Sequence, residues 1–572
     1  MSGKILDKSG GLASWPAALY FLLLLASILA SESFASDTDK TASSAPRLVV
    51  LITVDQLRGD LPMRYRERLV EGGFRYLMEQ GTHYTNAHYR HANTETAVGH
   101  ATLVTGADPS RHGIVTNDWF DQKTGKPVYN TEDDRHHLIG EEPREHQGVS
   151  PRNLLASTIG DELILSNAGQ SRVFSVSGKD RGAILPGGHA GKAFWYSKSS
   201  GQFVTSTYYY NEYPKWVADW NTSKPADRYR GKQWKLLLPL ESYFARDIDD
   251  REYEADFGSL GRTFPHNYGD DKNTNLLVGL TPAIDELTLE FAKQTIEHEK
   301  LGAGEITDFL AVSLSAADYA GHLFGPSSLE SEDTILRLDR TLASFFEFLD
   351  KTIGLENTLI ALSADHGGPE APEYVVERIG MEAGRYEFDH FKQPNELTAA
   401  LKQRFGRDDL ICAHSHPYLH LDYNVIREAG LNPSEVERFV AAEAVKLPGI
   451  AYAMSRSELV DGQYVDAPIQ RQIRRSFHFD RSGSVHLVPD QYWFMHSTDE
   501  AANMGLSGLT AIHGSPWPYD TYVPIFFAGH KVKAQRVERR VAPTDIAPTI
   551  SNYLGIKYPS GNIGNPLEEV FQ

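Results

Sequence analysis

The chain has 572 residues, of which 41% are hydrophobic and 23% are charged, a composition typical of a globular protein with a large core. The length allows two to four domains, or one large α/β enzyme core with long insertions. The formal net charge of −20 argues against nucleic-acid binding, which requires a basic face, and an anionic substrate would have to be attracted by local positive charge.

The N-terminal segment has the pattern of a secretory signal peptide. Two lysines precede an apolar run from Ala17 to Ala30, and a small-residue cleavage site ends at Ala35. The run is too short for a comfortable membrane span, although an uncleaved anchor is the alternative. We therefore expect residues 1–35 to be a signal peptide, residues 36–46 to be a flexible lead-in, and the mature chain to have no stable membrane span.

Cysteine usage indicates the compartment. Cys412 is the only cysteine in the sequence, so the chain cannot form an internal disulfide. An exported chain with one cysteine fits a bacterial periplasm better than a disulfide-rich extracellular module. We expect a periplasmic or secreted protein in which Cys412 is a small structural thiol.

Apolar runs rich in β-branched residues predict strands that are buried on both faces, as in a parallel sheet. They lie at residues 48–54, 173–176, 309–314, 358–362 and 523–528. Between two of these runs, apolar residues spaced three and four apart from Ile335 to Ile353 predict an amphipathic helix that stops at Gly354. Strands that alternate with helices predict an α/β fold with a doubly wound, mostly parallel sheet flanked by helices.

Long insertions interrupt this predicted core. We expect the core to comprise residues 47–369 and 506–572. The insertions at residues 118–150 and 190–275 are distinguished by charged residues and histidine in the first, and by aromatic residues and glycine in the second. Residues 370–505 have helix and strand patterns of their own and are expected to form an α+β cap subdomain.

Carboxylates and histidines occur close to the ends of the predicted strands. In open parallel sheets, ligands bind beyond the carboxyl ends of the strands. Each residue alone is typical of a helix cap, a turn or a surface histidine, but together they provide the oxygen and nitrogen ligands that zinc takes in hydrolytic sites. The residues are Asp55, Asp318, His322, Asp365, His366 and His513.

A loop at residues 91–95 enters a predicted helix at Thr96. A hydroxyl at a helix N-terminus lies beside unpaired backbone N–H groups and the positive end of the helix dipole, where a phosphate group is stabilised. An ordinary threonine N-cap is the alternative interpretation. A second threonine, Thr94, competes for the role of nucleophile.

Taken together, the motifs resemble those of the alkaline phosphatase superfamily, which has a type I phosphodiesterase/nucleotide pyrophosphatase-like fold. Within it they resemble the monomeric periplasmic alkaline phosphatases that use threonine as the nucleophile. The resemblance covers most of residues 47–555, and several ordered motifs are far more specific than one. They are Thr-Val-Asp55, Thr96-x-x-Gly-His-Ala, Thr105-Gly-Ala-Asp-Pro-Ser-Arg-His-Gly-Ile-Val-Thr-Asn117, Asp318-x-x-x-His322, Ser-Ala-Asp365-His366-Gly-Gly and His513-Gly.

The resemblance implies two Zn²⁺ ions and a monomer. One ion would be held by Asp318, His322 and His513, and the other by Asp55, Asp365, His366 and the Thr96 oxygen. The family's spacing from the nucleophile to Asn117 favours Thr96 over Thr94. Thr96 would attack phosphorus and form a covalent phosphothreonine, while the Asn117 amide would stabilise the non-bridging oxygens.

A Lys-x-Arg pair, Lys179 and Arg181, follows the predicted strand at residues 173–176. An isolated pair of this kind is typical of a solvated turn, but this one lies at a strand exit and matches the pair of the family's monoesterase branch. A monoester carries more negative charge than a diester. The resemblance therefore implies that Lys179 neutralises substrate charge and that Arg181 donates bidentate hydrogen bonds.

We therefore expect an exported, zinc-dependent alkaline phosphatase that hydrolyses small phosphate monoesters and releases inorganic phosphate. The alternative is a phosphodiesterase or nucleotide pyrophosphatase of the same superfamily, against which the Lys179/Arg181 pair argues. A sulfatase fits less well because Thr96-Ala-Val-Gly-His departs from its Cys/Ser-x-Pro-x-Arg pattern. A phosphonate hydrolase is a further alternative, and a non-catalytic phosphate- or metal-binding protein is the alternative from another class.

The other histidines have no counterpart in this metal set, and we interpret most of them as surface or packing residues. Those in the insertions are His136, His137, His414, His416 and His420, and those near the nucleophile are His83, His88 and His91. The aromatic residues of the range 190–275 are likewise expected to pack the scaffold.

Overall fold

The structure, a computed structural model, describes residues 45–142, 148–387, 395–496 and 508–571. The predicted signal peptide and residues 36–44 of the expected lead-in lie outside the described residues. From Ala45 onward, the described chain forms one compact unit. Among the helices of this unit, none is both long and apolar enough to cross a membrane.

A ten-stranded mixed sheet forms the centre of this unit, in the order β20-β2-β19-β12-β1-β11-β6-β7-β8-β5. Its middle is parallel. There β1 (Leu48–Val54) pairs with β11 (Asp308–Leu314) and β12 (Thr358–Ser363), and β6 (Val173–Ser177) and β7 (Lys192–Tyr196) continue beyond β11. Every residue of β1, β11 and β12 is buried, as expected for apolar runs covered on both faces. The predicted α/β fold with a mostly parallel sheet is confirmed.

One long strand beside the parallel strands runs in the opposite direction. β19 (Tyr522–Gly529) is antiparallel to β12 and to β2 (Thr82–His88), and β20 (Gln535–Val537) lies beyond β2. The start of β19 therefore lies at the edge of the sheet where β12 ends, and it brings the segment before it to that edge. On the other side, β8 (Phe203–Ser206) and β5 (Leu138–Ile139) complete the sheet.

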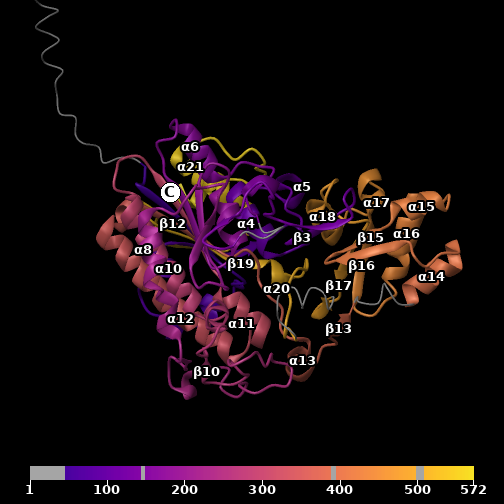
Figure 1. The fold of residues 1–572 in the computed structure, drawn as a ribbon, viewed down its shortest axis with the longest axis horizontal. Coiled ribbons are helices and arrows are strands. Elements are labelled where there is room, and N and C mark those ends of the chain that lie inside the picture. The colour runs from indigo at the N-terminus through magenta and orange to yellow at the C-terminus, as the bar shows by residue number, and fades with distance from the viewer. Residues whose placement is uncertain (1–44, 143–147, 388–394, 497–507, 572) are drawn as a thin grey trace, which may run out of the picture. The chain divides into compact units, whose positions relative to one another are not determined.

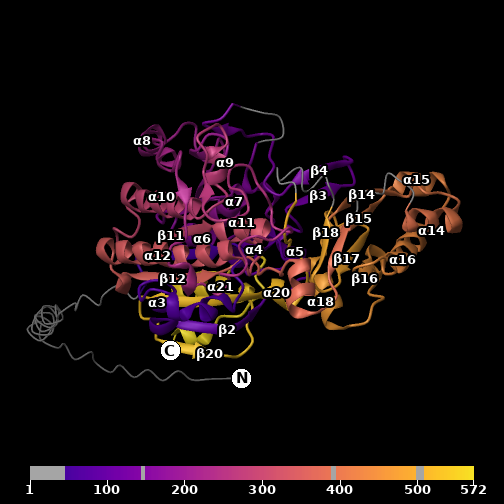
Figure 2. The ribbon, with the colours of Figure 1, turned by 90° about the horizontal axis from the view of Figure 1, so that it is seen from below.

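Helices cover both faces of the sheet (Figures 1 and 2). One face carries α3 (Phe74–Gln80), α10 (Ala283–Glu299) and α12 (Leu329–Thr352), and the other carries α4 (Thr96–Thr105), α6 (Ile159–Ser166), α7 (Asp180–Gly187) and α21 (Ile546–Leu554). The predicted amphipathic helix is α12. The Ser328 side chain accepts a hydrogen bond from the Ser331 N–H and caps its start, and Ile335, Leu338 and Leu342 are buried.

The range 370–505 includes a second sheet with its own hydrophobic cluster, drawn in orange in Figure 1. The strand order is β14 (Ile411–Ser415), β15 (Tyr418–Leu421), β17 (Val485–Pro489) and β16 (Ile450–Ser455), and the pairing is antiparallel. The helices are α14 (Glu396–Phe405), α15 (Tyr423–Glu428), α16 (Pro433–Ala444), α17 (Arg456–Asp461) and α18 (Pro468–Ser476). Two short strands, β13 (Gly384–Glu387) and β18 (Trp493–His496), pair in parallel.

The two shorter expected insertions differ in how they relate to the core. The range 190–275 begins within the core, because β7 and β8 are strands of the central sheet. The range 118–150 contains a hairpin of β3 (Asp118–Asp121) and β4 (Lys126–Tyr129), and β5 reaches the edge of the central sheet. β3 also contacts β14 of the second sheet.

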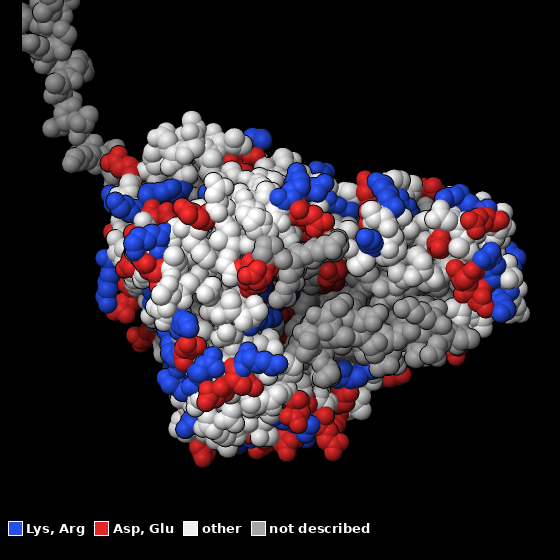
Figure 3. All heavy atoms as spheres, viewed as in Figure 1, with Lys and Arg blue, Asp and Glu red and all other residues white. Residues whose placement is uncertain are grey.

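The remaining elements are short apart from two nine-residue helices. They are α2 (Leu61–Arg64), η1 (Arg66–Arg68), α5 (Pro109–His112), η2 (Pro151–Asn153), α8 (Lys215–Ser223), η3 (Pro225–Tyr229), β9 (Gln233–Trp234), η4 (Leu240–Ser242), β10 (His266–Asn267), α9 (Thr274–Val278), α11 (Ala316–Phe324), η5 (Leu355–Asn357), α13 (Pro372–Tyr374), η6 (Val375–Ile379), α20 (Pro518–Thr521), η8 (Pro543–Asp545) and η9 (Glu568–Phe571). Acidic and basic side chains are interspersed over the described part of the face in Figure 3, so a broad basic surface does not cover it.

Candidate active site

The residues singled out at the strand exits meet at one edge of the central sheet. Asp55 follows β1 directly, and Asp365 and His366 follow β12. Asp318 and His322 lie one turn apart on α11, which follows β11, so they share a face of that helix. His513 reaches the same edge because it precedes the antiparallel strand β19. All six side chains are buried.

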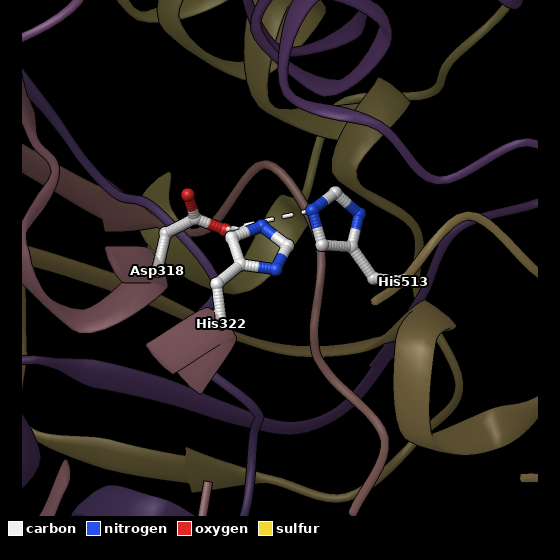
Figure 4. A group of neighbouring side chains, drawn as sticks. All are labelled: Asp318, His322 and His513. Carbon is white, nitrogen blue, oxygen red and sulfur yellow. Dashed lines mark ion pairs between the residues drawn. The ribbon is translucent and has the colours of Figure 1, made fainter. Parts of the chain in front are cut away.

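The first group consists of Asp318, His322 and His513, whose ligand atoms all lie within 4.8 Å of one another (Figure 4). Asp318 Oδ1 lies 3.1 Å from His322 Nε2 and 3.5 Å from His513 Nε2. One carboxylate and two imidazoles are a ligand set that zinc takes in catalytic sites. These are the three residues that the family resemblance assigns to one ion.

The second group consists of Asp55, Asp365 and His366. His366 Nε2 lies 3.3 Å from Asp55 Oδ1 and 3.6 Å from Asp365 Oδ2. These three atoms are buried, and none has a hydrogen-bond partner within the described parts of the chain. Asp318 also lies within 4.8 Å of Asp55 and His366, so its carboxylate stands between the two groups. A divalent cation would satisfy the unpartnered atoms.

The three histidines are held in one tautomer. The Nδ1 atoms of His322, His366 and His513 each lie 2.8 Å from a backbone carbonyl oxygen, those of Ala511, Gly367 and Thr94 respectively. A carbonyl oxygen can only accept, so each Nδ1 carries a proton and Nε2 is the ring nitrogen that faces the carboxylates. Metal-binding histidines are oriented by hydrogen bonds of this kind.

Burial and neighbouring charges both shift the pKa values of these groups, in several cases in opposite directions. Burial alone would lower the pKa of His366, but Asp365 and Asp55 raise it to about 9. Burial and Asp318 would raise the pKa of Asp55, but Lys179 and His366 hold it below its ordinary value. Burial, together with the nearby His366, lowers the pKa of His513 to about 3. The site thus keeps Asp55 ionised in a buried environment.

Lys179 lies inside this cluster. It directly precedes α7, and its Nζ lies 2.5 Å from Asp55 Oδ2 and 2.5 Å from Asp318 Oδ2. Burial would lower the pKa of Lys179, but Asp318 and Asp55 raise it above its ordinary value. The family resemblance implies contact with substrate, whereas the structure places the ammonium between one carboxylate of each group.

Arg181 occupies the first turn of α7, two residues further on. Its Nη1 lies 3.5 Å from the Tyr129 hydroxyl, which donates to Asp180. Its Nε is buried and has no hydrogen-bond partner within the described ranges. Burial would lower the pKa of Arg181, but Tyr129 and Asp180 raise it, so the guanidinium carries its charge with a free donor.

The two candidate threonines differ in what their hydroxyl groups contact. The Thr94 hydroxyl donates to the backbone oxygen of Ser515 at 2.9 Å. Thr96 is the first residue of α4, and its hydroxyl has no hydrogen-bond partner among the residues that the structure describes. The Thr96 hydroxyl is therefore available at a helix N-terminus, as a nucleophile for phosphate would need to be.

Asn117 lies beside the start of α4. Its Oδ1 accepts a hydrogen bond from the Ala97 N–H at 3.0 Å, and its own N–H donates to Glu95 Oε2 at 2.6 Å. The first contact fixes which end of the side-chain amide is the acceptor, so the Nδ2 donor is left for another partner. An N–H donor next to Thr96 can stabilise charge on a phosphoryl oxygen.

Sequence reasoning assigned no role to three polar residues of the site. Gln56 donates to Asp365 and to Asp318, and Glu95 positions Asn117. His100 Nδ1 lies 2.8 Å from the backbone oxygen of Thr96 and 3.2 Å from Asp365 Oδ2. His100 stands one helical turn after Thr96, a spacing that could have indicated it, whereas a glutamine after a strand gives no such signal.

Several of the remaining histidines have packing contacts, as expected. The ring of His83 stacks on Phe526 with the centroids 4.4 Å apart. The ring of His420 contacts Phe120. His416 differs, because its Nε2 lies 3.1 Å from the backbone oxygen of Gly514, directly after His513.

The sequence is similar to one protein-family profile and to several named proteins. The sequence profile of the type I phosphodiesterase / nucleotide pyrophosphatase family matches residues 49–516. A protein of Myroides odoratus named calcium-transporting ATPase is 39% identical over 92% of this chain and 95% of its own. Alkaline phosphatase PafA of Elizabethkingia meningoseptica is 38% identical over 92% of this chain and 94% of its own.

Two crystal structures of PafA are also similar to this chain. The wild-type protein has a TM-score of 0.84 at 37% identity, and a variant has 0.84 at 36% identity. Both matches cover 92% of this chain and 99% of the other. In the variant, one threonine, one asparagine, one lysine and one arginine are substituted.

Proposed function

The chain belongs to the type I phosphodiesterase / nucleotide pyrophosphatase family and is an alkaline phosphatase, and from this premise we propose that it hydrolyses phosphate monoesters through a covalent intermediate on Thr96. The observation that carries the proposal is the meeting of Asp55, Asp365 and His366. One buried atom of each has no hydrogen-bond partner within the described residues, next to the first group of ligands. Unpartnered buried oxygens and an imidazole nitrogen are costly unless a cation binds them.

We propose that two zinc ions occupy the site. Asp318, His322 and His513 would hold one, and Asp55, Asp365, His366 and the Thr96 oxygen would hold the other. Bound in this way, such ions lower the pKa of a hydroxyl or a water and stabilise the oxygen that leaves. The Nδ1 contacts of the three histidines support this assignment, because they direct each Nε2 atom inward, where a bound cation would replace any proton on it.

The side chains of the protein would supply the nucleophile and bind the phosphoryl oxygens. Thr96 Oγ attacks phosphorus, the bond to the leaving-group oxygen breaks, and a phosphothreonine remains, which water then hydrolyses to inorganic phosphate. The Asn117 amide and the free Nε donor of Arg181 would hold the non-bridging oxygens. The N-terminus of α4 adds its partial positive charge at the same place.

The spacing of these residues along the chain supports this assignment of roles. In the PafA variant, the substituted threonine, asparagine, lysine and arginine are separated along the chain by the same numbers of residues as Thr96, Asn117, Lys179 and Arg181. Four residue types at three matching intervals are a specific correspondence. It favours Thr96 over Thr94 as the nucleophile.

Charge favours a monoester over a diester as the substrate. Lys179 and Arg181 add two positive charges beside the buried carboxylates, and both side chains have a raised pKa. A monoester dianion gains more from such charges than a diester monoanion does. A phosphodiesterase of the same superfamily is the competing proposal.

We further propose that the protein is exported and acts as a monomer. The support for export is the sequence pattern at residues 1–35, which lie outside the described residues, whereas the monomer rests on the family resemblance alone. N-terminal sequencing of the mature protein from a periplasmic fraction should find a start near residue 36. An intact Met1 would reject cleavage, and a sedimentation mass of twice the mature chain would reject the monomer.

The decisive experiment compares an aryl phosphate with its methyl diester, each with and without a chelator. The monoester should be hydrolysed far faster, and the chelator should abolish turnover until Zn²⁺ is restored. Equal or faster hydrolysis of the diester would reject the monoesterase. Zinc binding without turnover of either ester would indicate a non-catalytic binding protein.

A further inference from the structure

Gln56 contacts both groups of ligands. Its backbone N–H donates to Asp365 Oδ1 at 3.1 Å, and its side-chain Nε2 donates to Asp318 Oδ1 at 3.1 Å. The residue directly follows Asp55 and is 6% exposed. One residue therefore links three carboxylates. Gln56 is covalently bonded to Asp55, and it holds Asp365 by a backbone hydrogen bond and Asp318 by a side-chain hydrogen bond.

The contact with Asp365 determines which oxygen of that carboxylate faces the site. Oδ1 accepts from the N–H of Gln56 and, at 3.0 Å, from the N–H of His366. Oδ2 is thereby left to face His366 Nε2, where it has no hydrogen-bond partner within the described chain. The backbone of Gln56 thus directs a predicted ligand atom inward.

The backbone conformation of Gln56 is unfavourable for its residue type. Its φ is 64°, in the left-handed region that glycine and asparagine tolerate and that glutamine rarely adopts. A non-glycine residue persists in such a conformation when its surroundings determine it, and these conformations concentrate at functional sites. The position would be easier to fill with glycine, but glycine has no amide that could reach Asp318.

Two glycines leave room for this side chain. Gly321 lies inside α11, between Asp318 and His322, and a Cβ there would overlap Gln56 Oε1. A Cβ at Gly368 would lie 2.9 Å from Gln56 Cδ. Glycine weakens a helix relative to alanine, so the glycine at position 321 has a packing reason, which is the Gln56 amide.

We propose that Gln56 is a positioning residue that fixes the separation of the two metal-ligand groups by holding Asp318 of the first and Asp365 of the second. This inference rests on the proposed two-metal function. Hydrogen bonds from outside the ligand set that orient the ligands typically change metal affinity by about 10- to 100-fold. Gln56 acts through the two carboxylates, without touching the substrate.

The first test uses Gln56→Gly and Gln56→Asn, both compatible with a positive φ. Each retains the backbone donor to Asp365, but Gly lacks the amide and Asn is one methylene too short to keep the Asp318 contact. Release of Zn²⁺ from the loaded protein into a chromogenic chelator should show one of the two equivalents leaving about 10-fold faster or more in both variants. Lys224→Gly is the matched control, because Lys224 is exposed and has a φ of 51°. It should release Zn²⁺ at the wild-type rate.

The second test asks whether Gly321 acts through Gln56. Gly321→Ala should displace the amide and also speed the release of one Zn²⁺ equivalent. In the Gln56→Gly background the same alanine has no amide to displace, so it should add little, and the double variant should equal Gln56→Gly. Excess Zn²⁺ should restore kcat in all of these variants, which a general loss of folding would not allow.

The outcomes separate this inference from the proposed function. Wild-type protein that binds no Zn²⁺ would overturn both. Wild-type protein with two equivalents, together with Gln56 variants that release both at the wild-type rate, would overturn the role of Gln56 alone. Variants that lose both equivalents equally and are not rescued by excess Zn²⁺ would show a general structural role and would also overturn it.

Discussion

Replacing Lys179 should destabilise the metal-free protein more than the zinc-loaded protein. Its ammonium lies 2.5 Å from Asp55 and 2.5 Å from Asp318, and all three side chains are buried. Lys179→Ala removes the charge and leaves two carboxylates facing one another. Lys179→Met removes the charge but keeps most of the volume, so it is the control for lost packing.

The size of the effect follows from the burial of the pair. Removing one partner from a buried ion pair costs about 3–5 kcal/mol, because the other charge stays buried and unpaired. With an unfolding entropy near 2.1 cal/mol/K per residue, about 500 residues give about 1 kcal/mol/K. The Tm of the metal-free variants should therefore fall by about 3–5 °C. Bound Zn²⁺ would compensate the same carboxylates, so the fall in the loaded protein should be smaller.

The assay is calorimetry of wild type and both variants, with chelator and with Zn²⁺. A fall in Tm that is equal in both conditions would show that the ammonium does not compensate the carboxylates, and the reasoning would be refuted. A fall for Lys179→Ala but none for Lys179→Met would assign the effect to packing.

The same variants should lose more kcat/KM on an aryl phosphate than on its methyl diester, by about 10-fold for one charge-assisted contact. Equal losses on both esters would remove Lys179 from substrate discrimination.

Three other substitutions test the chemistry of the site and the electrostatics outside it. Thr96→Ala should abolish the acid-stable phosphoprotein that forms with a radiolabelled monoester, whereas Thr94→Ala should retain it, and the reverse result would move the nucleophile. Burial and Glu330 raise the pKa of Glu254 from 4.5 to about 8. The folded state therefore holds a proton that the unfolded state releases, and stability should fall as the pH rises from about 4.5 to about 8. Glu254→Gln should remove up to about 4 kcal/mol of this pH dependence in denaturant unfolding between pH 5 and pH 9, and parallel curves for both proteins would contradict the shift.

The position of the candidate site could be predicted from local sequence because each proposed ligand lies beside a recognisable strand. Asp55, Asp318 and Asp365 follow runs of buried residues whose carboxyl ends meet at one edge of a parallel sheet. His513 was singled out because it lies beside a predicted strand, but it precedes that strand, so the carboxyl-end rule alone does not bring it to the same edge. Its place depends on the antiparallel direction of β19, which pairing between distant strands determines.

Other features of the site depend on contacts that leave no pattern in the sequence. The position of the Lys179 ammonium between two carboxylates is set by charges that are distant in sequence, which a Lys-x-Arg motif does not reveal. The role inferred for Gln56 depends on a positive φ and on space beside Gly321, and neither follows from residue type. The range 190–275, which its aromatic residues and glycines predict to be an insertion, begins with β7 and β8 of the central sheet.

The position of β19 near the end of the sequence also affects the order in which the molecule folds. The proposed ligands extend from Asp55 to His513, so the two ends of the site are separated by most of the chain. Contacts over such separations carry a large loop-closure cost and form late in folding. A chain still lacking β19 would present His322 and Asp318 without their third partner, and it would bind zinc weakly. High-affinity metal uptake would therefore mark the completion of folding, and the cation would stabilise a finished core without guiding its formation.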